Sequence, residues 1–248
     1  MTTYSPIERR QRGALRLAAL LLAGIGALAW LGRSADPAAK PLPSGPLTLG
    51  AAIAFTGNAN LYGQDQRMGL AVAERWAQQS APGGRPVRLQ LEDGASDEPS
   101  AIAAFNLLIR QGVIALIGPT LSQQAFAADP IAQRQGVPVV APSNTAKGIP
   151  EIGHFISRVS AQSSVIAPLS IDEALRRDPA LKRVAVFYAQ DDAFSTSEVA
   201  IFQKVLAARG LTPITVQRTQ LADNDFQTPI TSTLQLKPQL VVLSVQAV

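Results

Sequence analysis

The side chains best suited to hold a small ligand are hydroxyls and amides that directly follow apolar runs. Ser122 comes after Val113–Ile117, and Ser143–Thr145 comes after Val137–Val140. Hydroxyl groups, and the unpaired N–H groups at the start of a helix, both donate hydrogen bonds to a carboxylate or another anion. These positions therefore indicate an anion-binding site, and Ser122 is predicted to be a helix N-cap.

Two further clusters could complete such a site. Tyr62 stands among Gly and Asn residues in the predicted loop Thr56–Gly63, where its ring would form an amphipathic wall beside a small ligand. Asp191 and Asp192 follow the apolar run Arg183–Tyr188, and they form either a solvated turn or a contact to a ligand cation.

The elements that must position these residues alternate between strand and helix. Buried strands are short apolar runs, and amphipathic helices repeat their apolar residues every three or four positions. On these criteria we expect strands at 47–55, 87–91, 113–117, 137–140, 183–188, 213–217 and 240–245. Besides the helix that begins at Ser122, we expect helices at 63–79, 99–110, 164–177, 197–209 and 226–236.

This order predicts an α/β fold of two halves, each repeating strand and helix, joined by an extended crossover at 155–158. Polar loops follow the strands in both halves. Open parallel sheets bind ligands at the carboxyl ends of their strands. The candidate side chains thus fall where such a fold is expected to bind a ligand.

Composition excludes several kinds of chemistry. The chain has no cysteine and a single histidine, His154, so a thiol nucleophile and a Cys-based or His-rich metal site are excluded. A Ser-His-Asp triad would have to use His154, which is interpreted as an ordinary loop residue. The loop acids Asp93, Asp97 and Glu98 are interpreted as caps of the following helix rather than as a metal cluster. We therefore expect no enzyme activity, no metal and no cofactor.

Residues 1–34 carry a separate signal. An Arg-rich stretch precedes the apolar run Leu17–Leu31, and small residues follow it, as in an export signal. The run is short for a membrane span, yet extending it from Ala14, with Trp30 near its outer end, would let it cross. A cleaved signal peptide and a retained anchor both stay open, and either would export the rest of the chain.

The formal net charge of +4 resides entirely in residues 1–34, because the acidic and basic residues of the remainder balance. The body of the sequence has no basic stripe, so nucleic acid is not an expected partner. Residues 35–46 are rich in Pro, Ala and Ser and are predicted to be a linker.

With its loops in this order, the chain resembles the type I periplasmic substrate-binding proteins of ABC transporters, specifically the branched-chain amino acid (Leu/Ile/Val-binding) group. The resemblance runs from about Leu47 to the C-terminus. It rests on AFTGNANLYGQDQRMGLAVA, EDGASDEPSAIAAFNLLI, LIGPTLSQQAFAADPIAQRQGVPVVAPSNT, FISR, RVAVFYAQDDAFS and DNDFQTPI. It implies two Rossmann-like lobes that close on a ligand without chemistry, lobe 1 at 47–158 and a partial lobe 2 at 159–248.

The resemblance also implies a set of ligand-binding residues. They are Tyr62, Ser122, Ser143, Asn144, Thr145, Asp192, Ala193 and Phe194. Ser122 corresponds to the family's carboxylate-binding serine, and Tyr62 to its first-loop aromatic residue. Ala193, with Phe194 beside it, stands where the family usually has a tyrosine. The acidic residue that meets a ligand ammonium group in the family would lie beyond residue 248.

The expected function is that of an exported solute-binding protein, located in the periplasm. It would capture a small amino-acid-like ligand between its lobes and deliver it to an ABC permease in the membrane. The alternative is a membrane-anchored ligand-sensing or regulatory domain of the same fold, which a retained N-terminal helix would favour. Family members are normally longer and cross between the lobes three times, whereas this sequence predicts one crossing.

Overall fold

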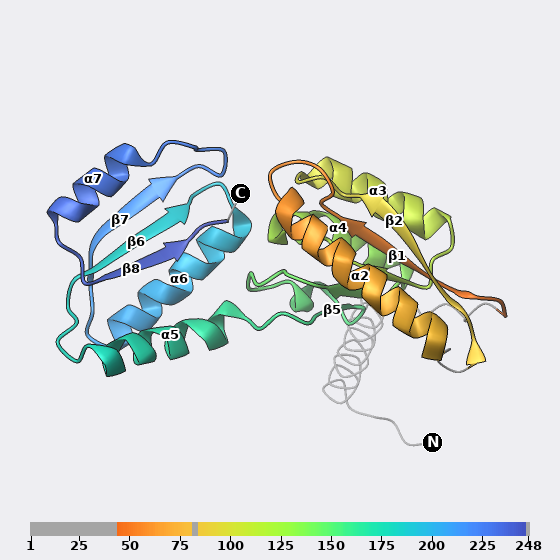
Figure 1. Ribbon diagram of the computed structural model, residues 1–248, viewed down its shortest axis with the longest axis horizontal. Coiled ribbons are helices and arrows are strands. Elements are labelled where there is room, and N and C mark those ends of the chain that lie inside the picture. Colours follow the sequence, from red (N-terminus) through yellow and green to blue (C-terminus); the bar gives the residue numbers. More distant parts are fainter. Residues whose placement is uncertain (1–43, 81–83, 247–248) are drawn as a thin grey trace, which may run out of the picture. The chain divides into compact units, whose positions relative to one another are not determined.

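A computed structural model describes residues 44–80 and 84–246. The predicted signal or anchor at 1–34 and nearly all of the predicted linker lie outside these residues. The described chain is an α/β fold with two parallel sheets (Figure 1). Among the residues that the structure describes, no helix is long and apolar enough to span a bilayer.

The first sheet has five strands and the second has three. The first contains β1 (Leu47–Ile53), β2 (Val87–Asp93), β3 (Ala115–Ile117), β4 (Val139–Ala141) and β5 (Ile156–Arg158). The second contains β6 (Val184–Ala189), β7 (Pro213–Thr219) and β8 (Leu240–Ser244). The helices are α2 (Asn60–Ser80), α3 (Glu98–Arg110), α4 (Ser122–Gln135), α5 (Ser163–Arg177), α6 (Ala193–Ala208) and α7 (Gln227–Gln235).

Strand order determines where each sheet leaves a crevice between its loops. The first sheet runs β2-β1-β3-β4-β5 and the second runs β7-β6-β8, with every pair of neighbours parallel. In each sheet the chain moves outward in one direction and then returns past its first strand, so the order reverses between β1 and β3 and again between β6 and β8. The loops that leave the strands on either side of such a reversal diverge and leave a crevice.

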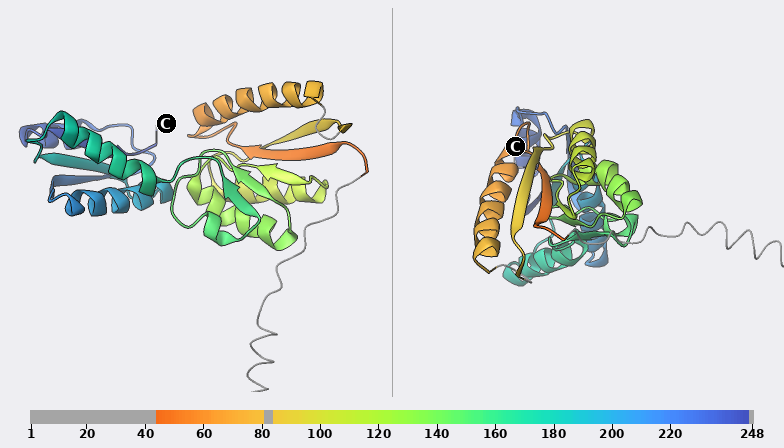
Figure 2. Two further views of the ribbon diagram at one scale, coloured as in Figure 1. Left: turned by 90° about the horizontal axis from the view of Figure 1, so that it is seen from below. Right: turned by 90° about the vertical axis from the view of Figure 1, so that its right-hand side faces the viewer.

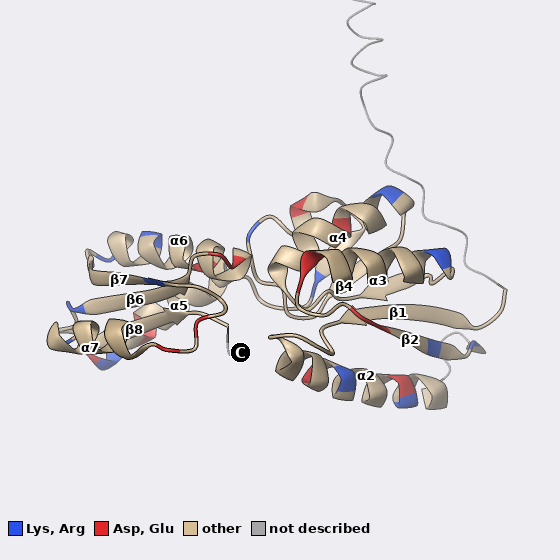
Figure 3. Cartoon of the chain, turned by 90° about the horizontal axis from the view of Figure 1, so that it is seen from above, with Lys and Arg blue, Asp and Glu red and all other residues tan. Residues whose placement is uncertain are grey.

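Helices cover both faces of each sheet. In Figure 3, α2 lies on one face of the first sheet and α3 and α4 on the other, and the second sheet lies between α6 and α7. Phe105 and Leu108 of α3 pack with Leu116 of β3 in the first core. Val184 and Val186 of β6 pack with Leu206 of α6 in the second. Each sheet therefore has its own apolar core, of the kind that buried β-branched strands and amphipathic helices produce.

The predicted order of strands and helices is confirmed, and several boundaries are wrong. Helix α2 begins at Asn60, so Tyr62 lies on a helix rather than in a loop. Helix α6 begins at Ala193 instead of Ser197, because Asp192 caps it. Residues Ile156–Arg158 are not merely a crossover, since they pair with β4 as the fifth strand of the first sheet.

The division of the chain into lobes stays a prediction. The two sheets fall on either side of residue 158. All of the described residues nevertheless belong to one compact unit.

Candidate functional site

A cavity of about 210 Å³ lies where loops from both sheets meet. Its lining residues follow β1, β3 and β4 of the first sheet and β6 and β8 of the second. They are Tyr62, Thr120, Leu121, Ser122, Ser143, Thr145, Phe194, Val245 and Gln246. All of these strands present their carboxyl ends here, beside the reversal points in both sheets, which is where an open α/β fold is expected to bind a ligand.

A second cavity, of about 360 Å³, is larger but less suited to a specific ligand. It lies beside α7 and has almost only apolar atoms on its surface, from residues such as Phe187, Leu234 and Leu243. A ligand site usually combines apolar walls with a few polar groups that fix the ligand's orientation. We therefore take the smaller cavity as the candidate site, because five hydroxyl-bearing side chains and one amide-bearing side chain line it.

The start of α4 forms one wall of the site. The N-cap of this helix is Leu121, so the prediction that Ser122 is the N-cap is wrong by one residue. The side chain of Gln124 takes over the capping role, because its Oε1 accepts from the Leu121 N–H at 3.0 Å while its Nε2 donates to the Gly94 carbonyl at 2.8 Å. Ser122 is thus the first helical residue, and its hydroxyl lines the cavity.

Ser122 and Thr145 have hydroxyl protons that are available to a ligand. The Ser122 Oγ accepts a long hydrogen bond from the Ala146 N–H, at 3.4 Å, and donates none within the described residues. The Thr145 hydroxyl makes no hydrogen bond to any described residue and also lines the cavity. Two hydroxyl donors beside a helix N-terminus suit a carboxylate, which accepts several such bonds at once.

Ser143, by contrast, is already engaged. Its Oγ donates to the Thr120 carbonyl at 2.6 Å and accepts from Gln66 Nε2 at 2.9 Å. The Thr120 hydroxyl donates to Gln66 Oε1 at 2.7 Å and accepts from the Ala54 N–H at 2.9 Å. This network joins the ends of β1, β3 and β4 to α2, so Ser143 holds the walls in place and has no proton left for a ligand.

Tyr62 forms a third wall. It packs against the apolar cluster of Ala54, Ala59 and Leu121 and lines the cavity from α2. The loop before it is held by Asp93 at the end of β2, whose carboxylate accepts from Thr56 Oγ1 at 2.6 Å. Burial acts to raise the pKa of Asp93, but hydrogen bonds from Thr56, Ala95 and Phe55 outweigh it and lower that pKa.

Asp192 lies behind the cavity wall instead of in it. The residue is fully buried, so its interpretation as a solvated turn is wrong. Its Oδ2 accepts from the N–H and the hydroxyl of Ser195, at 2.9 and 2.7 Å, and from Gln246 Nε2 at 3.3 Å. The carboxylate thus caps α6 and holds Gln246, which lines the cavity together with Phe194.

Asn144 and Ala193 are also absent from the cavity lining. Asn144 is fully buried, and its Nδ2 donates to the Thr120 carbonyl at 3.1 Å. Ala193 is the first residue of α6. The structure therefore brings Tyr62, Ser122, Ser143, Thr145 and Phe194 together around one cavity, and ligand contacts by the other three candidates stay predictions.

A second acid, the half-buried Glu198, lies close to Asp192. Burial raises the pKa of Glu198, hydrogen bonds from Ser244 and Ser163 oppose that rise, and the nearby Asp192 carboxylate adds to it. The side of the site formed by the second sheet is therefore backed by two acidic side chains. On the other side, Asp97 caps α3 through a 2.8 Å bond from the Ser100 N–H, as predicted. Within residues 44–80 and 84–246, no three His, Asp or Glu side chains are grouped as metal ligands.

Sequence reasoning missed several residues of the site: Gln66, Thr120, Leu121, Val245 and Gln246. Thr120 could have been found, because it is a polar residue directly after the strand exit Gly118-Pro119. Gln66 carries no local signal, since a glutamine on a helix is ordinary. Val245 and Gln246 become wall residues only because β8 pairs with β6 and ends beside the start of α6.

A family model described as "Periplasmic binding protein" matches residues 46–247. The Leu/Ile/Val-binding protein BraC3 of Rhizobium johnstonii is 25% identical over 198 residues, which are 77% of this chain and 52% of that protein.

Solved structures share the fold. A solute binding protein of an ABC transporter from Rhodopseudomonas palustris, in complex with 3,4-dihydroxy benzoic acid, superimposes with a TM-score of 0.72 at 21% identity, over 82% of this chain and 55% of that one. The branched-chain amino acid transporter substrate binding protein LivJ of Streptococcus pneumoniae, in complex with isoleucine, gives 0.71 at 20% identity, over 80% and 56%. The chain thus spans about half the length of the relatives it matches.

Proposed function

Because this chain belongs to the periplasmic binding protein family, we propose that it captures a small carboxylate-bearing solute in the cavity beside Ser122 and Thr145. The family consists of binding proteins rather than enzymes, and its members work outside the cytoplasm. We extend the family's binding role to the present chain, which would bind its solute for uptake by an ABC permease.

One observation carries the proposal. The Ser122 and Thr145 hydroxyls line a single cavity and donate to no described residue, while a neighbouring serine is fully engaged. The N–H groups of the first turn of α4 lie beside them and add partial positive charge. This is an incomplete hydrogen-bonding arrangement that a carboxylate would complete.

The finer proposal is an amino-acid-like ligand. One structural relative holds isoleucine and another holds 3,4-dihydroxy benzoic acid, and both ligands have a carboxylate group. The Asp192 carboxylate, which accepts from the wall residue Gln246, favours a ligand that also has a positive charge. An α-amino acid has both groups, whereas a hydroxybenzoate has only the carboxylate.

Calorimetric titration of the chain with a panel of α-amino acids and hydroxybenzoates tests the proposal. We expect saturable binding of at least one amino acid. A hydrogen bond to a charged group contributes about 1.5–3 kcal/mol, so the double substitution Ser122→Ala with Thr145→Val should weaken binding by roughly 100-fold or more. Ser170→Ala, on the exposed surface of α5, is the matched control and should change nothing.

Two results would count against this assignment. If none of the panel binds, the chain does not capture such solutes by itself. If a ligand binds equally well to the double variant and to the Ser170→Ala control, its binding site lies elsewhere in the chain. A preference for hydroxybenzoates over every amino acid would retain the carboxylate site and exclude the amino-acid-like ligand.

The role of residues 1–34 stays a prediction. A cleaved signal peptide agrees with a freely diffusing binding protein, and a retained anchor with the sensing domain considered above. N-terminal sequencing of the exported protein separates the two outcomes.

A further inference from the structure

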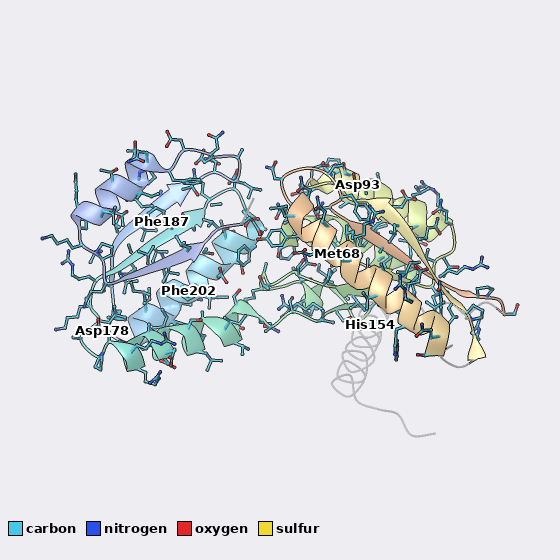
Figure 4. All side chains as sticks on the ribbon, in the orientation of Figure 1. Met68, Asp93, His154, Asp178, Phe187 and Phe202 are labelled. Carbon is cyan, nitrogen blue, oxygen red and sulfur yellow. The ribbon has the colours of Figure 1, made fainter. Side chains whose placement is uncertain are left out.

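Helix α2 has an apolar face that points away from the sheet it covers. Leu61, Met68, Val72 and Trp76 are spaced by seven, four and four residues, which places them on one side of the helix. Each is between 60% and 70% exposed. Figure 2 shows α2 with the first sheet on one side and no other described element on the opposite side, and Figure 4 labels Met68 on this helix. We call these four residues the α2 stripe.

The opposite side of α2 already makes the contacts that hold the helix on the sheet. Leu70, Glu74 and Ala77 are half-buried, and the Glu74 carboxylate accepts from the Leu89 N–H of β2 at 2.9 Å. The apolar residues of the α2 stripe are therefore not needed to attach the helix to its own sheet. A solvent-facing helix surface is normally polar, and a group of exposed apolar residues on one side of a helix indicates a partner.

The charges that flank the stripe are arranged symmetrically. Residue 70 is the midpoint between Met68 and Val72, and it is also the midpoint between Asp65 and Arg75. Asp65 and Arg75 are exposed, lie on the same side of the helix as the stripe, and form no ion pair within the described residues.

The centre of this surface is complementary to itself. If two copies of α2 pack antiparallel about a two-fold axis at residue 70, Met68 of one copy meets Val72 of the other, and Asp65 meets Arg75 twice. In the same register Trp76 and Leu61 lie opposite Gln64 and Gln79 and cover the ends of the contact. Two-fold interfaces use the same patch on both subunits and so require this kind of self-complementarity. A parallel pair would instead bring like charges together.

We propose that the α2 stripe is a homodimer interface, formed by antiparallel packing of α2 on α2 of a second copy of this chain. Gly69, beside the stripe, has no neighbouring atom within 4 Å of where a Cβ would lie, so it leaves room for close approach of the second helix. A stable interface buries about 800 Å² on each partner. One helix face provides only the centre of such an area, so the dimer should be weak and depend on protein concentration.

Charge exchange tests the pairing directly. We expect Asp65→Arg and Arg75→Asp each to weaken association about tenfold or more in sedimentation equilibrium, because each places like charges opposite one another twice. The double variant should restore it. Val72→Asp should abolish the dimer, while Leu169→Asp, equally exposed on α5, should leave it intact.

Because the chain has no cysteine, disulfide trapping tests the register. Asp65→Cys protein mixed with Arg75→Cys protein should form a cross-linked dimer under mild oxidation. Asp65→Cys protein alone should not, since its two sulfurs would lie about 15 Å apart along the helix pair.

The proposal is overturned if the full chain is monomeric at every concentration reached. It is also overturned if association is indifferent to Val72→Asp, as association through residues 1–34 would be. Failure of the double charge exchange to restore a dimer would exclude the antiparallel register and, with it, the proposal.

Discussion

Asp129→Asn is expected to stabilise the folded chain, increasingly so as the pH rises. Asp129 lies in α4, is fully buried, and neither of its carboxylate oxygens has a hydrogen-bond partner among the described residues. Burial raises its pKa from the ordinary value of 3.8 to about 8. At neutral pH the folded chain thus holds this side chain protonated, while the unfolded chain ionises it.

The sign of the pH dependence follows from proton binding. Between pH 3.8 and about 8 the unfolded state has lost a proton that the folded state keeps. The unfolded state therefore binds fewer protons, and the stability of the folded state falls as the pH rises through this window. One pKa unit corresponds to about 1.4 kcal/mol, so the full difference between the two ends of the window, 3.8 and about 8, is about 6 kcal/mol.

Asn has nearly the same shape as Asp and no charge to desolvate. The free energy of unfolding of Asp129→Asn, measured by urea titration, should match that of the unsubstituted chain near pH 4 and exceed it by several kcal/mol near pH 8. A difference that stays flat over this range would show that the Asp129 carboxylate is ionised in the folded chain, and would refute the prediction.

Asp172→Asn is the matched control, with the opposite sign. Hydrogen bonding from Arg209 lowers the pKa of Asp172 on the surface, although partial burial opposes this. The stability that the ionised Asp172 side chain contributes is present above its ordinary pKa and is lost as the pH falls. The Asn variant should therefore lose some stability at neutral pH and none in acid.

Gly63→Ala is expected to destabilise the chain strongly and to disturb the site. Gly63 is the buried residue of α2, and a Cβ added there would overlap the backbone carbonyl of Ala54 at the end of β1. Backbone cannot move aside as the end of a side chain can, so α2 would have to shift. Forcing extra atoms into a packed contact typically costs about 1–3 kcal/mol or more.

A displacement of α2 would also change the shape of the cavity. Tyr62 precedes Gly63 in α2, and Gln66 of the same helix holds Thr120 and Ser143. A ligand that depends on the proposed site should therefore bind more weakly to Gly63→Ala, even under conditions where the variant is folded.

Gly69→Ala on the same helix is the control, because it changes helix propensity without changing the packing of α2. No atom lies within 4 Å of a Cβ added at Gly69, so that change should stabilise α2 by about 0.5–1 kcal/mol. Urea midpoints measured in dilute solution should thus move in opposite directions for the two substitutions. Equal shifts would mean that Gly63 and Ala54 do not touch as described.

Much of the fold could be predicted because its signals are local. Strands such as Val184–Ala189 are short apolar runs, and Asp97 caps α3 three residues before the N–H that it binds. The carboxyl ends of β3 and β4 could be placed together because short βαβ connections make neighbouring parallel strands. The serine and threonine clusters that follow these strands could thus be assigned to one site.

Errors arose where a long-range contact decides a local boundary. Ser122 is not the N-cap of α4, because the Gln124 side chain takes the capping role while it donates a hydrogen bond to the Gly94 carbonyl. Asp192 was interpreted as part of a solvated turn or as a contact to a ligand cation, and the structure buries it, with its carboxylate bonded to Gln246. In each case the deciding partner is about 30 to 50 residues away, and no local pattern encodes it.

The sequence by itself thus determined the α/β order of elements, the loops that bear hydroxyl groups, and the absence of cysteine chemistry, since each depends on residue type and short-range periodicity. Only the tertiary structure decided which hydroxyls are available to a ligand. Ser143 and Thr145 look alike in the sequence, but Gln66 and Thr120 converge on Ser143 and occupy its hydrogen-bonding capacity. Tertiary packing likewise buried Asp129 without a partner and left the α2 stripe exposed, because burial depends on what other parts of the chain bring to each residue.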